Sequence, residues 1–106
     1  MKKTEREKQI ARIGKMEGYL DQAAQAVMLL SVALERYAEA KESIRALSDY
    51  YGSEEWKQDF ADDEAGLLPS DLKRGVLSED SIWNVLSDSR ELEERMGEIA
   101  GKTQED

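Results

Sequence analysis

The residues that come closest to a chemical site in this sequence are acidic. The densest group consists of Asp59, Asp62, Asp63, Glu64 and Asp71. Carboxylates at close spacing can hold calcium or magnesium. A calcium loop, however, needs acidic or amide side chains at alternate positions before a glycine, with a glutamate further on. The stretch lacks that alternation and no glutamate follows at the right distance, so we interpret it as a solvated helix end and predict no metal site.

Other side chains that do chemistry are scarce. The chain contains no cysteine and no histidine, which excludes thiolate nucleophiles and cysteine-ligated zinc and removes the usual general base. Among 24 acidic residues, close carboxylate pairs arise by chance. The sequence has no nucleophile elbow, phosphate-binding glycine loop or metal motif. We therefore predict a non-enzymatic protein without a cofactor, and an acidic metal-dependent hydrolase is the weakest hypothesis.

A short basic island, Lys73-Arg74-Gly75, interrupts the acidic second half of the chain. We expect Lys73 and Arg74 to pair with neighbouring carboxylates such as Asp71 or Glu79, because ion pairing explains the island better than anion binding. Both remain candidate interaction residues because they lie at a predicted corner of the fold.

The net charge of -9 is unevenly distributed over the 106 residues. Residues 1–15 carry six basic and two acidic groups, a balance of +4, and the rest of the chain has a balance of -13. Such an acidic chain repels nucleic acid and anionic lipid, so we expect neither as a direct partner. No apolar run is long enough to span a membrane and no apolar segment follows Met1-Lys2-Lys3, which predicts a cytoplasmic protein.

The elements that would position these residues begin with one long helix over about residues 5–50. This range has no proline and only two glycines. Apolar residues alternate three and four apart, as in a heptad seam: Ile13, Met16, Leu20, Ala23, Val27, Leu30, Leu34 and Tyr37. The apolar stripe then shifts to Ala40, Ile44, Leu47 and Tyr51. Gly14 and Gly18 mark a weak point where the helix could kink and fold its first turns back.

The rest of the chain predicts two shorter helices joined by a turn. Gly52 is placed to end the long helix, and Ser53 to cap a helix over about 54–63 that has Trp56 and Phe60 on its inner face. Ser70 starts a single turn over 70–74 that Gly75 stops. Ser78 caps a helix over about 79–100, whose inner stripe consists of Ile82, Val85, Leu86, Ser89, Leu92, Met96 and Ile99.

These elements predict one all-α domain, a helical hairpin or three-helix bundle in which the last helix packs antiparallel on Ala23–Leu47. That helix is too short to cover the whole long helix. The apolar residues left uncovered are Ile10, Ile13, Met16, Tyr19 and Leu20. An exposed apolar stripe of this size is typical of a surface that binds a partner, and we name these five as candidate interaction residues.

Two parts of the sequence resemble a known family. The first is Arg12-Ile13-Gly14-Lys15-Met16-Glu17 with Leu20-Asp21. The second runs from Tyr50-Tyr51-Gly52-Ser53 to the more specific stretch Leu68-Pro69-Ser70-Asp71-Leu72-Lys73-Arg74-Gly75-Val76-Leu77-Ser78-Glu79-Asp80. Together they resemble the small bacterial proteins grouped as the domain of unknown function DUF4298. The resemblance implies a single domain of bacterial or phage origin in the cytosol and implies no catalytic residues.

Two functional hypotheses follow. The leading one is a helical protein–protein interaction module, an adaptor or accessory protein that acts through its long helix on a protein partner or on a second copy, with a dimer favoured. The alternative is an acidic inhibitor that mimics nucleic acid and blocks a basic groove, because the balance beyond residue 15 is -13.

Overall fold

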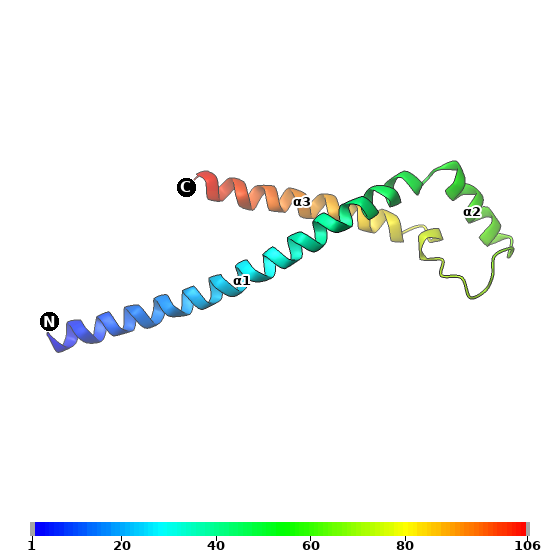
Figure 1. Cartoon of the computed structure of the whole chain (residues 1–106). Helices are drawn as coiled ribbons and strands as arrows, with labels where there is room; N and C mark the ends of the chain where they lie inside the picture. The colour runs from blue at the N-terminus through cyan, green and yellow to red at the C-terminus, as the bar shows by residue number, and fades with distance from the viewer. Residues whose placement is uncertain (1, 106) are drawn as a thin grey trace. The chain divides into compact units, whose positions relative to one another are not determined.

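The computed structural model describes residues 2–105, and over that range the protein is all-α. The elements are α1 (Lys3–Tyr50), α2 (Glu54–Glu64), the short 3-10 helix η1 (Gly75–Leu77) and α3 (Ser81–Glu105), in that order (Figure 1). No strand occurs among residues 2–105. The predicted fold class is therefore confirmed. The chain divides into two structural units, Met1–Ala40 and Lys41–Asp106.

Helix α1 is uninterrupted at both of its glycines. A glycine costs a helix roughly 1 kcal/mol relative to alanine, and the many good helix formers around Gly14 and Gly18 outweigh that cost. The kink that the sequence allowed there does not occur. No other atom lies within 4 Å of where a Cβ would stand on either glycine, so nothing packs closely at these two positions.

Local signals set the ends of α1 and α2. Gly52 follows α1 with φ 80°, a left-handed conformation that glycine adopts at low cost. The Ser53 side chain accepts a hydrogen bond from the Trp56 backbone N–H at 3.1 Å, as its predicted capping role requires. Gly66 has φ 73° and donates to the Asp63 carbonyl, while Leu67 donates to the Asp62 carbonyl. This pair of bonds is a Schellman motif and ends α2.

Aromatic residues fix α2 against the segment that follows it. The Trp56 ring stacks on Phe60 at 5.3 Å between centroids, as their spacing predicts, and meets Tyr51 edge-on at 5.4 Å. The Trp56 indole N–H also donates to the Val76 carbonyl at 2.9 Å. This bond satisfies the polar end of a large apolar side chain and holds η1 beside α2.

The corner between α2 and α3 is built around Arg74. Its guanidinium pairs with the Asp63 carboxylate and donates to the Pro69 carbonyl at 2.5 Å. The sequence predicts Asp71 or Glu79 as the partner, and Asp63 takes that place because the chain turns back on the end of α2. The sequence predicts a helical turn over residues 70–74 that ends at Gly75. The structure instead has its helical turn at η1, which begins at Gly75.

Helix α3 begins where the Ser78 hydroxyl accepts a hydrogen bond from the Ser81 N–H at 3.2 Å. The helix continues past Gly101 to Glu105, because a glycine flanked by helix formers does not end a helix by itself. Near its start lie the two buried apolar residues of the described chain, Leu77 and Ile82. Ser89 is also buried, whereas Val85, Leu92 and Ile99 of the predicted inner stripe are exposed.

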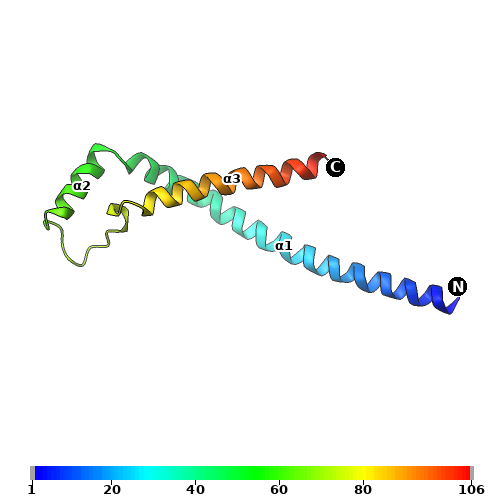
Figure 2. The ribbon, with the colours of Figure 1, turned by 180° about the vertical axis from the view of Figure 1, so that it is seen from behind.

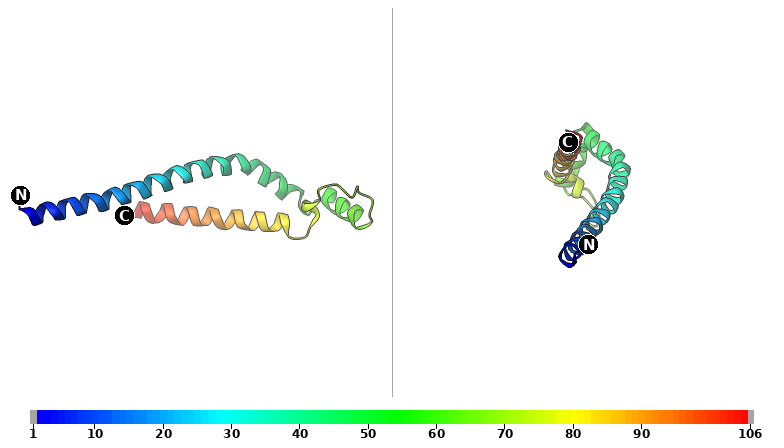
Figure 3. Two further views of the ribbon diagram at one scale, coloured as in Figure 1. Left: turned by 90° about the horizontal axis from the view of Figure 1, so that it is seen from below. Right: turned by 90° about the vertical axis from the view of Figure 1, so that its left-hand side faces the viewer.

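The second unit pairs the last turns of α1 with the first half of α3. The two segments run antiparallel (Figure 2), and they lie side by side when seen from below (Figure 3). Lys41 and Glu93 form an ion pair across them at 2.8 Å. Ile44 and Leu47 are half-buried there, as the predicted shift of the apolar stripe requires.

Burial along α1 is confined to its end. Half-buried apolar side chains begin at Tyr37, and residues 23–36 are all exposed. The sequence predicted that the last helix covers α1 from Ala23 onward. Within the second unit, the Lys41–Glu93 ion pair joins the end of that range to α3.

Candidate functional site

Five of the predicted interaction residues lie together on α1 in the first unit. Ile13, Met16 and Leu20 belong to the heptad seam, and Ile10 and Tyr19 flank it. All five are between 52% and 63% exposed. The Lys15 ammonium lies 5.9 Å from the centre of the Tyr19 ring, close enough for a weak cation–π interaction. This part of the candidate surface is therefore apolar with a basic edge.

The exposed apolar surface extends further along α1 than the five predicted residues. Val27, Met28, Leu29, Leu30, Val32 and Leu34 are between 43% and 67% exposed. The sequence predicted that the last helix packs on Ala23–Leu47, a range that includes them. A signal in the sequence could have identified them, because no charged residue stands between Asp21 and Glu35. A helix without charge on any face is normally buried. A helix that packs on its own chain along one face only would be expected to carry charged residues on its other faces, and this segment carries none.

The other two predicted residues, Lys73 and Arg74, lie in the second unit. Arg74 is engaged in its contacts with Asp63 and Pro69, so its role is structural. Lys73 is exposed and lies at the edge of a shallow apolar groove. The other residues that line this groove are Leu47, Gly75, Val76, Ser81, Ile82 and Val85.

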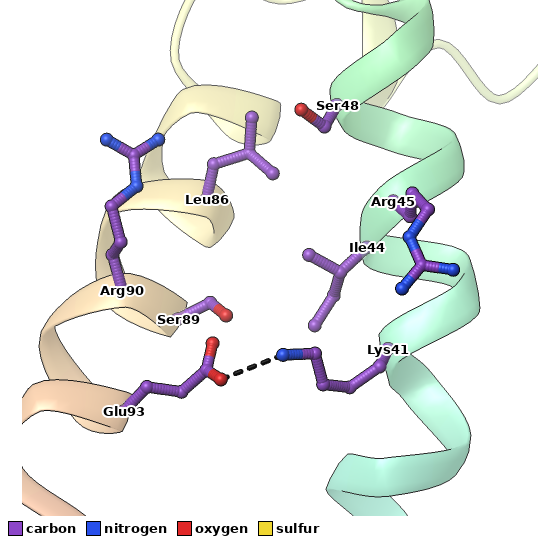
Figure 4. A pocket seen from close by; sticks show the side chains of 8 residues that line it. All are labelled: Lys41, Ile44, Arg45, Ser48, Leu86, Ser89, Arg90 and Glu93. Carbon is purple, nitrogen blue, oxygen red and sulfur yellow. Dashed lines mark hydrogen bonds and ion pairs between the residues drawn. The ribbon is translucent and has the colours of Figure 1, made fainter. Parts of the chain in front are cut away.

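A second groove runs between the end of α1 and α3. Figure 4 shows Ile44 and Leu86 extending into the space between the two helices, with the Lys41–Glu93 ion pair at one end. The remaining lining residues are Arg45, Ser48, Ser89 and Arg90. We interpret the groove as loose helix packing, because the small side chains of Ser48 and Ser89 leave the space between the helices unfilled. Its walls carry charges of both signs and no histidine or cysteine.

Three of the five residues in the densest acidic group make contacts within the fold. The Tyr50 hydroxyl donates to the Asp59 carboxylate at 2.6 Å, and this hydrogen bond raises the pKa of Tyr50 to about 12. The Gln58 amide donates to Asp62 at 2.8 Å, and Asp63 holds Arg74. Within residues 2–105, no group of three acidic side chains converges in a way that could hold a metal ion.

No helix in the described part of the chain is long and apolar enough to cross a membrane. The charge-free segment of α1 lies between charged residues on both sides, so its apolar length falls short of a membrane span.

Comparison with protein-family models gives a match. The model described as Domain of unknown function (DUF4298) matches residues 13–99. The match begins at the first seam residue of α1 and ends within α3, so it spans most of both structural units. No curated protein and no solved structure matches the chain. The chain belongs to the DUF4298 family.

Proposed function

We propose that this protein is a non-enzymatic helical interaction module that binds a protein partner through α1. The observation that carries the proposal is the exposed apolar surface from Ile10 to Leu34. Contiguous apolar patches of this size are rare on monomeric proteins and are typical of interaction sites.

The lack of packing along α1 supports the same proposal. None of its residues is buried, yet most of the stability of a helix in a protein comes from packing of its apolar face. Burying a large aliphatic side chain contributes about 1.5–3 kcal/mol. Side chains that are about half exposed, such as Leu29 and Leu30, retain roughly half of that contribution for a partner. A partner helix would therefore stabilise α1 and bind to it in one step.

Cross-linking in the cell that makes the protein tests this proposal. A photoreactive amino acid is placed at Leu30 in one variant and at Glu54 in a matched control, because the Glu54 side chain is 93% exposed and lies outside α1. We expect a specific cross-linked product from position 30, with either a second copy or another protein, and none from position 54. Absence of any product from position 30, or equal products from both, would reject the proposal.

The second candidate function is the nucleic-acid mimic, and a different region favours it. Residues 41–106 carry eight basic and 18 acidic side chains, a balance of -10, while residues 1–40 are close to neutral at +1. A mimic would bind basic proteins through the second unit, and that binding would weaken steeply as salt increases. Binding through α1 would depend little on salt. A titration at two salt concentrations therefore distinguishes the two candidates.

A further inference from the structure

Resting on the proposed function, we infer that the partner of α1 is a second copy of this chain, bound antiparallel with the pairing centred near Gln25. The contact surface is the α1 seam, which comprises Ile13, Met16, Leu20, Ala23, Val27, Leu30, Leu34 and Tyr37. The first seven of these are exposed and Tyr37 is half-buried.

The seam is complementary to itself when one helix is reversed. A two-fold axis near Gln25 places Ile13 beside Tyr37 of the second copy and Leu20 beside its Leu30, and the reverse contacts follow from symmetry. Met16 then meets Leu34, and Ala23 meets Val27. This register uses all eight seam positions and leaves none unpaired. It also avoids Ile44 and Leu47, which already pack within the second unit.

Charge favours the antiparallel orientation. In a parallel pair in register, residues 1–15 with their balance of +4 would lie beside their own copy, and like charges placed side by side destabilise a helix pair. Reversal places Lys15 level with Glu35 and Lys8 level with Glu42. The middle of the pair, between Asp21 and Glu35, contains no charge on either helix.

The area available is sufficient for a specific dimer. Residues 13–37 form about 36 Å of helix, and half the accessible circumference over that length amounts to about 700 Å² per chain. Stable interfaces bury about 600–1,000 Å² per partner. The residues that flank the centre of the seam are Ala24, Ala26, Ser31 and Ala33, and such small side chains let the two helices approach closely.

Single cysteines test the orientation directly, since the natural chain has none. In the antiparallel pair, the two copies of Ala26 lie within about 3 Å of the same level along the helices, so Ala26→Cys should give a covalent dimer as the main product with a short dimaleimide cross-linker. Ile13→Cys should give no covalent dimer, because the two thiols would be about 36 Å apart. A parallel pair would cross-link Ile13→Cys as well, and that result would overturn the inference.

Light scattering on the purified chain tests the partner. We expect twice the 12.0 kDa of one chain, and a return to 12.0 kDa for Leu30→Glu, which places a charge in the seam. Gln25→Glu adds the same charge on the opposite side of the helix and should remain dimeric. Tryptophan fluorescence reports that the second unit is still folded in both variants, because Trp56 and Trp83 both lie there.

The two proposals fail differently in these experiments. A monomeric natural chain whose position 30 still cross-links to a different protein in the cell would overturn self-pairing and leave the interaction function standing. A monomer without any cross-link at position 30 would overturn both. A dimer that survives Leu30→Glu would show that the chains associate through another surface and would reject the α1 seam.

Discussion

Residues 2–40 and residues 41–105 differ in how their helices are held. In the second unit, several helix ends have an identified contact: Ser53 caps the start of α2, the Ser78 hydroxyl accepts from the first N–H of α3, and Arg74 holds the corner between α2 and α3. In the first unit, the helix has no buried residue and its large apolar side chains are exposed. The same helix, α1, continues through both units, so local propensity suffices to specify it while its stabilisation differs along its length.

The two units also differ in charge, at +1 for residues 1–40 and -10 for residues 41–106. An apolar, nearly neutral helix suits association, and an acidic folded unit keeps the remaining surface from associating. Both tryptophans lie in the second unit, so fluorescence follows that unit alone while far-ultraviolet circular dichroism is dominated by α1. These two signals allow the comparison to be tested one unit at a time.

The largest expected difference in the free energy of unfolding is between two isoleucine-to-alanine substitutions, one in each unit. Ile82→Ala removes a side chain that is 2% exposed and should lower the free energy of unfolding by about 3 kcal/mol. Ile13→Ala, at a position that is 52% exposed, should change it by less than about 0.5 kcal/mol. Urea unfolding at low protein concentration measures both, with tryptophan fluorescence as the signal for Ile82→Ala and far-ultraviolet circular dichroism as the signal for Ile13→Ala. Equal losses would show that the two units unfold together.

The corner of the second unit gives the next largest effect. Arg74→Ala removes the contacts to Asp63 and the Pro69 carbonyl and should cost about 1.5 kcal/mol, because both partners are partly exposed and water replaces part of the loss. Lys73→Ala changes the same charge at an exposed position and should cost less than about 0.5 kcal/mol. Similar losses in the two variants would mean that net charge, not the Arg74 contacts, sets the stability of the corner.

Sequence reasoning succeeded in this protein where structure depends on neighbouring residues. The turn at Gly52, the cap at Ser53 and the shared face of Trp56 and Phe60 all follow from spacings of a few residues, whereas α3 begins at Ser81, two residues later than the predicted cap at Ser78 implies. The pairing of Arg74 with Asp63 could not be predicted in the same way, because it depends on how the whole corner folds back on α2.

The extent of the candidate surface was harder to predict than its position. Periodicity identified the apolar face of α1, yet an apolar stripe looks the same in a sequence whether the chain itself or a partner covers it. Val27 and Leu30 fall in the range that the last helix was predicted to cover, and both are exposed. The one signal in the sequence that favours a partner is the absence of charged residues on all faces of the helix between Asp21 and Glu35.

A pH titration sharpens the comparison through Tyr50, which links the end of α1 to α2. Asp59 accepts the hydrogen bond of the neutral phenol and raises its pKa from 10.0 to about 12. The stabilisation is therefore complete below pH 10 and is lost as pH rises toward 12. Tyr50→Phe should cost about 1 kcal/mol at neutral pH and should reduce the loss of stability above pH 10. Tyr19→Phe, in the first unit, should change neither the free energy of unfolding at neutral pH nor its loss above pH 10 when unfolding is followed by fluorescence.

The smallest expected effect is a gain in stability, and it tests whether other atoms contact α1 at Gly18. Gly18→Ala adds a methyl group where no other atom lies within 4 Å and should stabilise the helix by about 0.5–1 kcal/mol. Thermal unfolding followed by circular dichroism would report the gain. Gly18 lies on the side of α1 away from the seam, so the same variant should keep the light-scattering mass of the natural chain. If the mass fell instead, a partner backbone would have to approach α1 at this glycine, and the contact face would be that of Gly14 and Gly18 rather than the seam.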